Sequence, residues 1–179
     1  MEIKNRLYHT IYESPIGPLK IVSSDKGIVA IVHSDYEKGN SIRKVNSHTA
    51  GKTIVAESEY FENHPILIQA KEELGQYFAG ERERFDMPVE IEGTPFQVKV
   101  WRAMYNIPFG VVKTYGEVAA EAGSSKASRA VGLACKKNPL LIVVPCHRVI
   151  GANNRLTGFN IGIDRKRFLL EHENTKSYK

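Results

Sequence analysis

Short apolar runs alternate with turn residues over the first third of the chain. Residues 7–13, 19–23 and 28–33 carry the apolar runs, and stretches rich in proline, glycine, serine and aspartate separate them. Strand-length runs bounded by turn residues predict a three-stranded antiparallel meander. Residues 34–63 are polar and weakly patterned, so we interpret them as a loop with room for one short element. This half shows no catalytic cluster, and we expect it to act as a scaffold.

Two helices are predicted in the middle of the chain. Apolar residues recur at helical spacing from Pro65, and this pattern stops at Gly80. The second helix is expected to start at Thr94 and Pro95, because threonine is a good N-cap and proline suits the first helical position. Trp101 lies beside the apolar face of this helix. We expect it in the core rather than on a surface that stacks on bases.

The stretch after Thr114 has the outline of a helix-turn-helix. Thr114 and Glu117 form a capping box, which predicts a short helix to about residue 122. Gly123 provides a tight turn, and a second helix is expected over residues 126–137. Proteins with this motif place the second helix against DNA.

The second of these helices has two contrasting faces. One face is apolar and is expected in the core; it carries Ala127, Val131, Ala134 and Cys135. The opposite face carries small and basic residues, namely Ser125, Ser128, Arg129, Gly132 and Lys136. Small side chains allow a sugar–phosphate backbone to approach closely, and the two cations supply charge. A solvated face usually carries glutamate, whereas no acidic residue lies between Glu121 and Asp164, so the pattern favours DNA contact.

The charge balance changes between the two halves of the chain. Residues 1–93 contain 11 Lys and Arg against 15 Asp and Glu, a net charge of −4. Residues 94–179 contain 14 against 5, a net charge of +9, and the two halves together give the overall +5. Such a basic half suggests a polyanionic partner, since solubility alone requires less charge. We therefore expect the second half to bind nucleic acid.

A cysteine, a histidine and an arginine follow one another at the end of an aliphatic run. Residues 140–144 are apolar and lie between two prolines, which predicts a buried strand. Cys146, His147 and Arg148 follow it after one proline. Neighbouring cations or a histidine favour the thiolate, which is the nucleophilic form of cysteine. A buried structural cysteine is the alternative, but a polar corner at this point favours a nucleophile.

Two further elements follow the Cys-His-Arg corner. Residues 157–162 form a glycine-flanked loop of the kind that lines a pocket. Asp164 is expected to cap a helix that runs through Glu173, and Glu173 shares a face of this helix with two leucines. A buried carboxylate needs a partner, and His147 would serve as in a catalytic triad. An exposed glutamate at a frayed helix end fits the sequence equally well.

Cysteine usage and hydropathy argue against several classes of protein. The two cysteines, Cys135 and Cys146, lack Cys-x-x-Cys spacing, and the histidines show no ligand spacing. We therefore expect neither a disulfide framework nor a metal site. No stretch approaches the roughly 20 apolar residues that span a bilayer. The N-terminus lacks an apolar signal core, so export is not expected.

The chemistry-bearing segments of the second half resemble a known family. Pro145-Cys146-His147-Arg148-Val149, Tyr115 and residues 124–132 and 137–139 resemble the O(6)-alkylguanine-DNA alkyltransferases, also called methylated-DNA–protein-cysteine methyltransferases. The similarity covers nearly all of residues 64–179 and, more weakly, the N-terminal meander.

This resemblance implies an α+β fold with two domains. Residues 1–90 would form a small antiparallel-sheet (ribonuclease-H-like) scaffold domain, and residues 91–179 a mainly helical domain with the helix-turn-helix. The resemblance also implies a cytoplasmic monomer without cofactors that acts on double-stranded DNA. In a bacterium or archaeon such a protein would be associated with the nucleoid.

The resemblance implies DNA repair by direct reversal. The equivalent of Cys146 takes the alkyl group from O(6)-alkylguanine, and from O(4)-alkylthymine, after the base has been flipped out of the duplex. The equivalents of His147 and Glu173 generate the thiolate through a water, and the Tyr115 equivalent gives a proton to the departing base. The stable thioether makes each molecule act once.

The resemblance also implies a DNA-binding surface and a substrate pocket. The Arg129 equivalent fills the gap left by the flipped base, and the recognition helix enters the minor groove. The residues expected at the DNA are Arg129, Ser125, Ser128, Ala127, Gly132 and Lys136. The residues expected to line or support the pocket are Asn138, Arg148, Val149, Phe159, Asn160 and Lys166. Among these, Asn138 is expected to support the turn between the recognition helix and the nucleophile.

One loop departs from the family pattern. The family usually has an aromatic residue, a small residue and two glycines, whereas this chain has Phe159-Asn160-Ile161-Gly162. Phe159 can stack on guanine but lacks a tyrosyl hydroxyl, and Ile161 places a stiff side chain where the family has a flexible glycine. We expect normal methyl transfer with an altered preference among larger alkyl groups.

Two other functions compete with alkyl transfer. A cysteine hydrolase would use Cys146, His147 and Glu173, but adjacent Cys and His rarely face each other directly, and no separate oxyanion motif is visible. A non-enzymatic DNA-binding protein that senses lesions or regulates transcription would need no nucleophile, so Cys146 argues against it.

Overall fold

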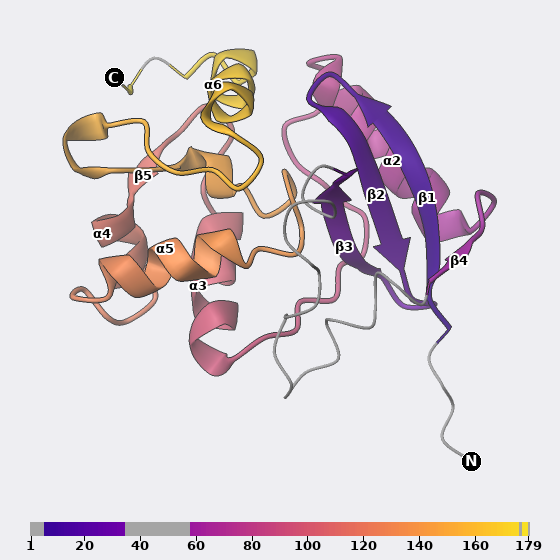
Figure 1. The fold of residues 1–179 in the computed structure, drawn as a ribbon, viewed down its shortest axis with the longest axis horizontal. Coiled ribbons are helices and arrows are strands. Elements are labelled where there is room, and N and C mark those ends of the chain that lie inside the picture. Colours follow the sequence, from indigo (N-terminus) through magenta and orange to yellow (C-terminus); the bar gives the residue numbers. More distant parts are fainter. Residues whose placement is uncertain (1–5, 35–57, 176, 179) are drawn as a thin grey trace. The chain divides into compact units, whose positions relative to one another are not determined.

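The computed structural model of the chain describes residues 6–34, 58–175 and 177–178. It divides the chain into two compact units, Met1–Glu92 and Gly93–Lys179, which are described one at a time (Figure 1). The content of helices and strands confirms the expected α+β class. Within the described ranges, no helix has the length and apolar character required to cross a membrane.

The N-terminal unit is built on a four-stranded sheet with the strand order β3-β2-β1-β4. Strands β1 (Tyr8–Ser14), β2 (Gly17–Ser23) and β3 (Ile28–His33) pair antiparallel, which confirms the predicted meander. Strand β4 (Glu59–Tyr60) pairs parallel to β1 and is a short element within residues 34–63, although its two residues carry no periodic pattern that could identify it as a strand. Most of the expected loop, residues 35–57, lies outside the described residues.

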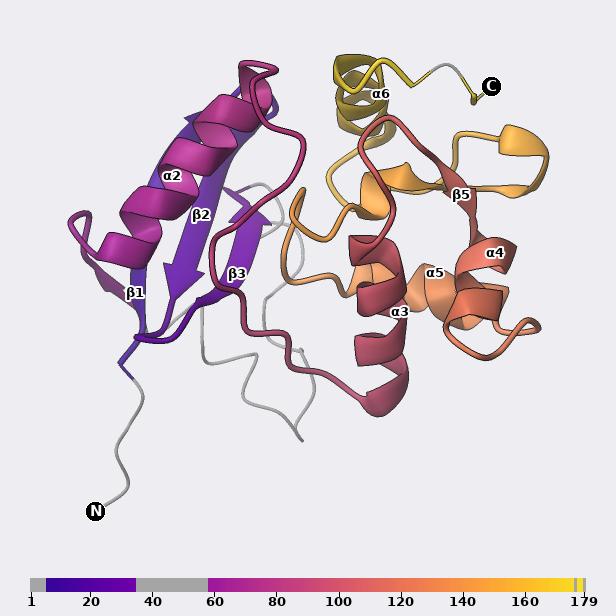
Figure 2. The same cartoon turned by 180° about the vertical axis from the view of Figure 1, so that it is seen from behind.

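Helix α2 (Pro65–Phe78) covers one face of this sheet (Figure 2). Its position and its end before Gly80 confirm the helix expected from Pro65. Leu67, Ala70, Leu74 and Tyr77 lie on the buried face of the helix and are completely inaccessible to solvent. The buried face of α2 and the inward-facing residues of the strands therefore form the core of the N-terminal unit.

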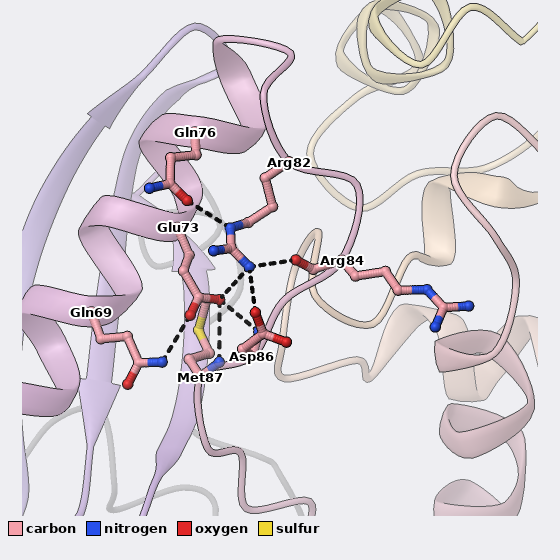
Figure 3. Close-up of polar contacts among 7 residues, drawn as sticks. All are labelled: Gln69, Glu73, Gln76, Arg82, Arg84, Asp86 and Met87. Carbon is pink, nitrogen blue, oxygen red and sulfur yellow. Dashed lines mark hydrogen bonds and ion pairs between the residues drawn. The ribbon is translucent and has the colours of Figure 1, made fainter.

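The buried carboxylate of Glu73 in α2 forms hydrogen bonds with the segment that follows the helix (Figure 3). Its Oε1 accepts a hydrogen bond from Gln69 Nε2 at 2.8 Å. Its Oε2 accepts from the backbone amides of Asp86 at 2.8 Å and Met87 at 3.2 Å. Arg82 lies 3.7 Å from the same oxygen and forms a shorter ion pair, 2.8 Å, with Asp86.

Replacing Glu73 by alanine is expected to lower the free energy of unfolding by about 2–4 kcal/mol, because the buried amide of Met87 and the partly buried amide of Asp86 lose their acceptor. Urea unfolding of the full chain measures the change. Glu72→Ala provides a matched control, because Glu72 is the exposed neighbour on the same helix. Equal losses in the two variants would show that the carboxylate contacts of Glu73 contribute nothing.

The C-terminal unit begins with the two capped helices that were expected. Helix α3 (Pro95–Tyr105) starts at a capping box formed by Thr94 and Gln97. Helix α4 (Tyr115–Glu121) starts at the predicted capping box of Thr114 and Glu117. Trp101 is 1% exposed and donates a hydrogen bond from Nε1 to the carbonyl oxygen of Ala134 at 2.9 Å, which confirms it as a core residue.

Helix α5 (Ser128–Lys136) follows α4 after a turn and packs beside it in both views (Figures 1 and 2). It begins two residues later than expected, because Ala127 is the N-cap and residues 124–127 form a turn. The unit continues with a short 3-10 helix, η2 (Cys146–Arg148), strand β6 (Val149–Ile150) and the 3-10 helix η3 (Ala152–Asn154). Strand β6 pairs parallel with β5 (Lys113–Thr114), so it joins the nucleophile segment to the start of α4.

The strand predicted over residues 140–144 is wrong. These residues are buried, as expected, but only Leu140 takes part in a β-bridge; the chain then turns over residues 141–143, and Ile142 has a positive φ of 71°. Local hydrogen bonds from Val143 N to Leu141 O and from Val144 N to Leu140 O, both 2.9 Å, hold this turn. An apolar run reports burial, and burial alone does not distinguish a strand from a packed turn.

The cap predicted for the last helix is also wrong. Helix α6 (Ile163–His172) has Gly162 as its N-cap, with φ 101°, a backbone conformation that favours glycine. Asp164 lies in the first turn and forms an exposed ion pair with Arg167 at 3.2 Å. Glu173 follows the last helical residue as the C-cap.

Candidate functional site

The thiol of Cys146 lies in η2, where the buried turn ends. Cys146 is 7% exposed, and its Sγ accepts a hydrogen bond from Asn138 Nδ2 at 3.2 Å. The same amide nitrogen donates to Val144 O at 2.7 Å, while Asn138 Oδ1 accepts from Leu140 N at 3.0 Å. Asn138 therefore spans the turn and fixes the thiol at its end.

The thiol is protonated at neutral pH unless a base removes its proton. Burial raises the pKa of Cys146 above its ordinary value of 9.0. The hydrogen bond from Asn138 and the positive charge of Lys166 oppose this increase without cancelling it. A nucleophilic role for Cys146 requires a proton acceptor nearby.

Glu173 lies at the centre of a buried polar cluster with His147 and Arg148. The distance from His147 Nε2 to Glu173 Oε1 is 2.7 Å. Arg148 donates to both carboxylate oxygens, from Nε at 2.8 Å and from Nη2 at 2.9 Å. Of the two alternatives for Glu173, the structure has the inward one, with the side chains of Glu173 and His147 completely buried.

Burial outweighs the charge of Glu173 and leaves His147 neutral. Burial would raise the pKa of Glu173, but His147 and Arg148 together hold it well below its ordinary value of 4.5. Burial lowers the pKa of His147 below 6.5, and this effect outweighs the attraction of Glu173. Because the carboxylate can only accept, the proton of the neutral ring belongs on Nε2. Nδ1 is then a free acceptor, and this buried atom has no hydrogen-bond partner among the described residues.

Two main-chain contacts of the cluster were missed from the sequence. Arg148 Nη1 donates to the carbonyl oxygen of Ile107 at 2.5 Å, and the amide of Gly110 donates to Glu173 Oε2 at 3.3 Å. Gly110 has φ 75°, and a Cβ at this position would lie 3.0 Å from the carbonyl oxygen of Glu173. The type of a residue does not reveal which hydrogen bonds its backbone groups make. Only the glycine at position 110, which suits a positive φ, could have indicated the contact between Gly110 and Glu173.

Tyr115 and the loop 157–162 lie together beside the first turn of α4. Burial raises the pKa of Tyr115 above its ordinary value of 10.0, while a hydrogen bond with Thr157 opposes the increase. A Cβ on Gly158 would lie 3.7 Å from the Tyr115 hydroxyl, and a Cβ on Gly132 would lie 3.9 Å from its ring. Tyr115 therefore contacts both the loop and α5 and keeps its proton at neutral pH.

Lys166 connects the loop to the segment that follows the nucleophile. Its ammonium group donates to Val149 O at 2.6 Å, to Thr157 O at 2.7 Å and to Gly158 O at 3.2 Å. The residue is completely buried, and this burial lowers the pKa of Lys166 to about 8. Lys166 thus holds one side of the loop in place through backbone carbonyls.

The rest of the loop contacts the end of α5. The side-chain amide of Asn160 donates to the carbonyl oxygen of Lys136. Phe159 is half-buried, whereas Ile161 is 5% exposed and its carbonyl accepts from Arg165 Nη1 at 2.7 Å. The Ile161 side chain therefore packs inward.

The DNA-binding candidates line one side of the helix-turn-helix. Ser125, Arg129 and Lys136 are exposed, and Ser128 and Gly132 are half-buried. Ala127 is half-buried as the N-cap of α5. Within the described ranges, no group of three or more His, Cys, Asp or Glu side chains could hold a metal ion.

The sequence matches two family profiles that together span most of the chain. Residues 95–175 match the profile "6-O-methylguanine DNA methyltransferase, DNA binding domain". Residues 7–91 match "6-O-methylguanine DNA methyltransferase, ribonuclease-like domain". The boundary between the two profiles lies within a few residues of the boundary between the two structural units.

Curated proteins and solved structures are similar to the chain over nearly its full length. A methylated-DNA–protein-cysteine methyltransferase of Methanosarcina acetivorans is 44% identical over 93% of this chain and 98% of its own length. The constitutive enzyme of Bacillus subtilis with the same name is 43% identical over 96% of this chain and 98% of its own. The crystal structure of Mycobacterium tuberculosis OGT in complex with DNA superposes with a TM-score of 0.78 at 36% identity, covering 96% of this chain and 95% of that one.

Proposed function

The chain belongs to the 6-O-methylguanine DNA methyltransferase family, and on this premise we propose that it repairs alkylated DNA by moving the alkyl group to Cys146. The substrates are O(6)-alkylguanine and O(4)-alkylthymine in double-stranded DNA. The observation that carries the proposal is the buried thiol next to a histidine whose Nε2 is bound to Glu173 and whose Nδ1 is free to accept a proton.

The reaction is one displacement at the alkyl carbon. The thiol proton passes through a water to His147 Nδ1, and Glu173 stabilises the resulting imidazolium. The Cys146 sulfur then forms a bond to the alkyl carbon while the bond from that carbon to the O(6) oxygen breaks. Tyr115 gives its proton to the departing base and recovers one from the imidazolium through solvent, so that overall one proton moves from the thiol to guanine. The product is a thioether, from which the Cys146 thiolate is a poor leaving group, so each molecule acts once.

A stacked base cannot present its alkyl carbon to a thiolate in line, so the base is flipped out of the duplex. Arg129 fills the gap that the base leaves, and the small residues of the α5 face let the helix lie in the minor groove. Asn138, Arg148, Val149, Phe159, Asn160 and Lys166 form or support the pocket that holds the flipped base. We place the protein in the cytoplasm as a monomer, associated with the nucleoid in a bacterium or archaeon.

Intact-protein mass spectrometry tests this function against its alternatives. The protein is incubated with a duplex that contains O(6)-methylguanine, and a gain of one methyl group per molecule is expected. Cys146→Ala should lose this gain while it still binds the duplex. A protein that binds the lesion without gaining mass would be a lesion sensor or regulator, and this result would refute alkyl transfer.

DNA binding is expected to weaken steeply with added salt. Cations that contact phosphates release condensed counterions, so the logarithm of the binding constant falls linearly with the logarithm of the salt concentration. Fluorescence anisotropy with an undamaged duplex at several salt concentrations measures the slope. A flat dependence would mean that the basic half of the chain has another partner.

Ile161 is expected to restrict the size of the alkyl group. Its buried side chain anchors the loop beside the pocket, so Ile161→Gly should loosen the loop and raise the rate with O(6)-benzylguanine relative to O(6)-methylguanine by roughly tenfold. Single-turnover rates with both substrates give the ratio. Ile161→Val keeps a branched side chain and serves as the control. The same ratio in the wild type and Ile161→Gly would argue against a role of this residue in selectivity.

A further inference from the structure

Leu133 is an apolar side chain with no place in the core. It is 62% exposed, the highest fraction among the large apolar side chains of the described residues. The buried side of α5 is made by Val131 and Ala134 instead. Truncating Leu133 would therefore cost the fold little, and its exposed surface is available to a partner.

The neighbours of Leu133 on the surface of α5 are cations. Arg129 lies one turn before it and Lys136 three residues after it, and both are exposed. At 3.6 residues per turn, Leu133 projects about 40° from Arg129 around the helix axis. The helix carries no acidic residue, so Leu133 is an apolar site within a positively charged surface.

This combination fits duplex DNA better than a protein partner. Lysine is depleted in protein–protein interfaces, and a single leucine surrounded by cations offers no apolar core for such an interface. A duplex has phosphates for the cations and, in its minor groove, the apolar edges of the deoxyriboses. Proteins that bind the minor groove frequently bring leucine and similar apolar side chains into it, where they insert between base steps.

We propose that Leu133 is a DNA contact residue that packs against deoxyriboses in the minor groove, next to the site where Arg129 enters the duplex. The proposal rests on the proposed function, because it places α5 on DNA. It assigns to Leu133 a part of the DNA affinity that does not depend on salt. An apolar contact releases water rather than counterions, whereas each cation contributes to the salt slope.

The test compares the DNA affinity of three variants of the full chain over a range of salt concentrations, with an undamaged duplex as the probe. Leu133→Ala is expected to weaken binding by roughly tenfold at every salt concentration and to leave the slope unchanged. Lys136→Ala should instead reduce the slope by about one. Phe168→Ala removes a 39% exposed apolar side chain from α6 and should change neither quantity.

An affinity of Leu133→Ala within twofold of the wild type at every salt concentration would overturn the proposal. A changed sedimentation coefficient alongside that result would show that Leu133 contacts a second copy of the chain instead. Thermal unfolding checks that the variant is folded.

A reaction with free base separates this proposal from the proposed function. Leu133→Ala should react with free O(6)-benzylguanine at the wild-type rate, because the free base has no duplex that Leu133 could contact. With a limiting amount of damaged duplex it should react more slowly. If the wild type itself gains no alkyl group, the proposed function fails. A Leu133→Ala variant with normal affinity and a wild type that transfers methyl would refute the role of Leu133 alone.

Discussion

Glu173→Ala is expected to abolish alkyl transfer and to lower the free energy of unfolding by about 3–5 kcal/mol. The variant leaves the guanidinium of Arg148 buried without its carboxylate, and the amide of Gly110 loses an acceptor. His147 also loses the group that fixes its proton on Nε2. Urea unfolding measures the first effect, and single-turnover methyl transfer measures the second.

The pH dependence of the stability that Glu173→Ala loses identifies the cause of the loss. Because the pKa of Glu173 lies well below 4.5 in the folded protein, its ionised form stabilises the fold fully above that value, and the stabilisation is lost as the pH falls towards the folded pKa. The difference between the wild type and Glu173→Ala should therefore shrink on acidification. Glu171→Ala removes an exposed carboxylate from the last turn of α6, two residues before Glu173, and should change stability by little. Normal alkyl transfer by Glu173→Ala would contradict the proton transfer from Cys146 to His147 that Glu173 is proposed to support.

Tyr115→Phe is expected to slow alkyl transfer by roughly 10²–10⁴-fold, the usual contribution of a general acid. Burial keeps the phenol protonated at neutral pH, so the hydroxyl can donate to the departing base. The phenylalanine retains the ring that lies near Gly132, and DNA affinity should change little. Single-turnover rates at saturating protein isolate the chemical step from binding.

Tyr105→Phe is the matched control for this substitution. Tyr105 is the last residue of α3 and is 43% exposed, so the loss of its hydroxyl should leave the rate unchanged. If Tyr115→Phe transferred methyl as fast as the wild type, the proton for the departing base would have to come from elsewhere.

Local patterns in the sequence were sufficient to predict most of the fold. The meander follows from alternation between apolar runs and turn residues. The start of α3 follows from Thr94 as the N-cap with Pro95 at the first helical position, and the start of α4 follows from a capping box of four residues. Strand β4 has two residues and no pattern of its own; it exists because β1 offers an edge. Residues 140–144 show a similar limit. Their apolar character predicts burial, but their turn geometry depends on hydrogen bonds with the side-chain amide of Asn138.

The site was only partly predictable for a related reason. The adjacency of Cys146 and His147 is visible in the sequence, and it identified the nucleophile segment. The carboxylate that orients His147 lies 26 residues away, and only the packing of the end of α6 against η2 determines that Glu173 turns inward. Lys166 is similar, because its three acceptors are backbone carbonyls. Contacts made through the main chain leave no trace in residue types.

The most direct test of the account locates the methyl group after one turnover. The protein is incubated with a duplex that carries O(6)-methylguanine with an isotopically labelled methyl group, digested, and mapped by peptide mass spectrometry. Cys146 should carry one labelled methyl group per molecule, and Cys135, the other free thiol, should carry none. A label on Cys135, a label on another residue, or no label on the protein would contradict the assignment of Cys146 as the acceptor.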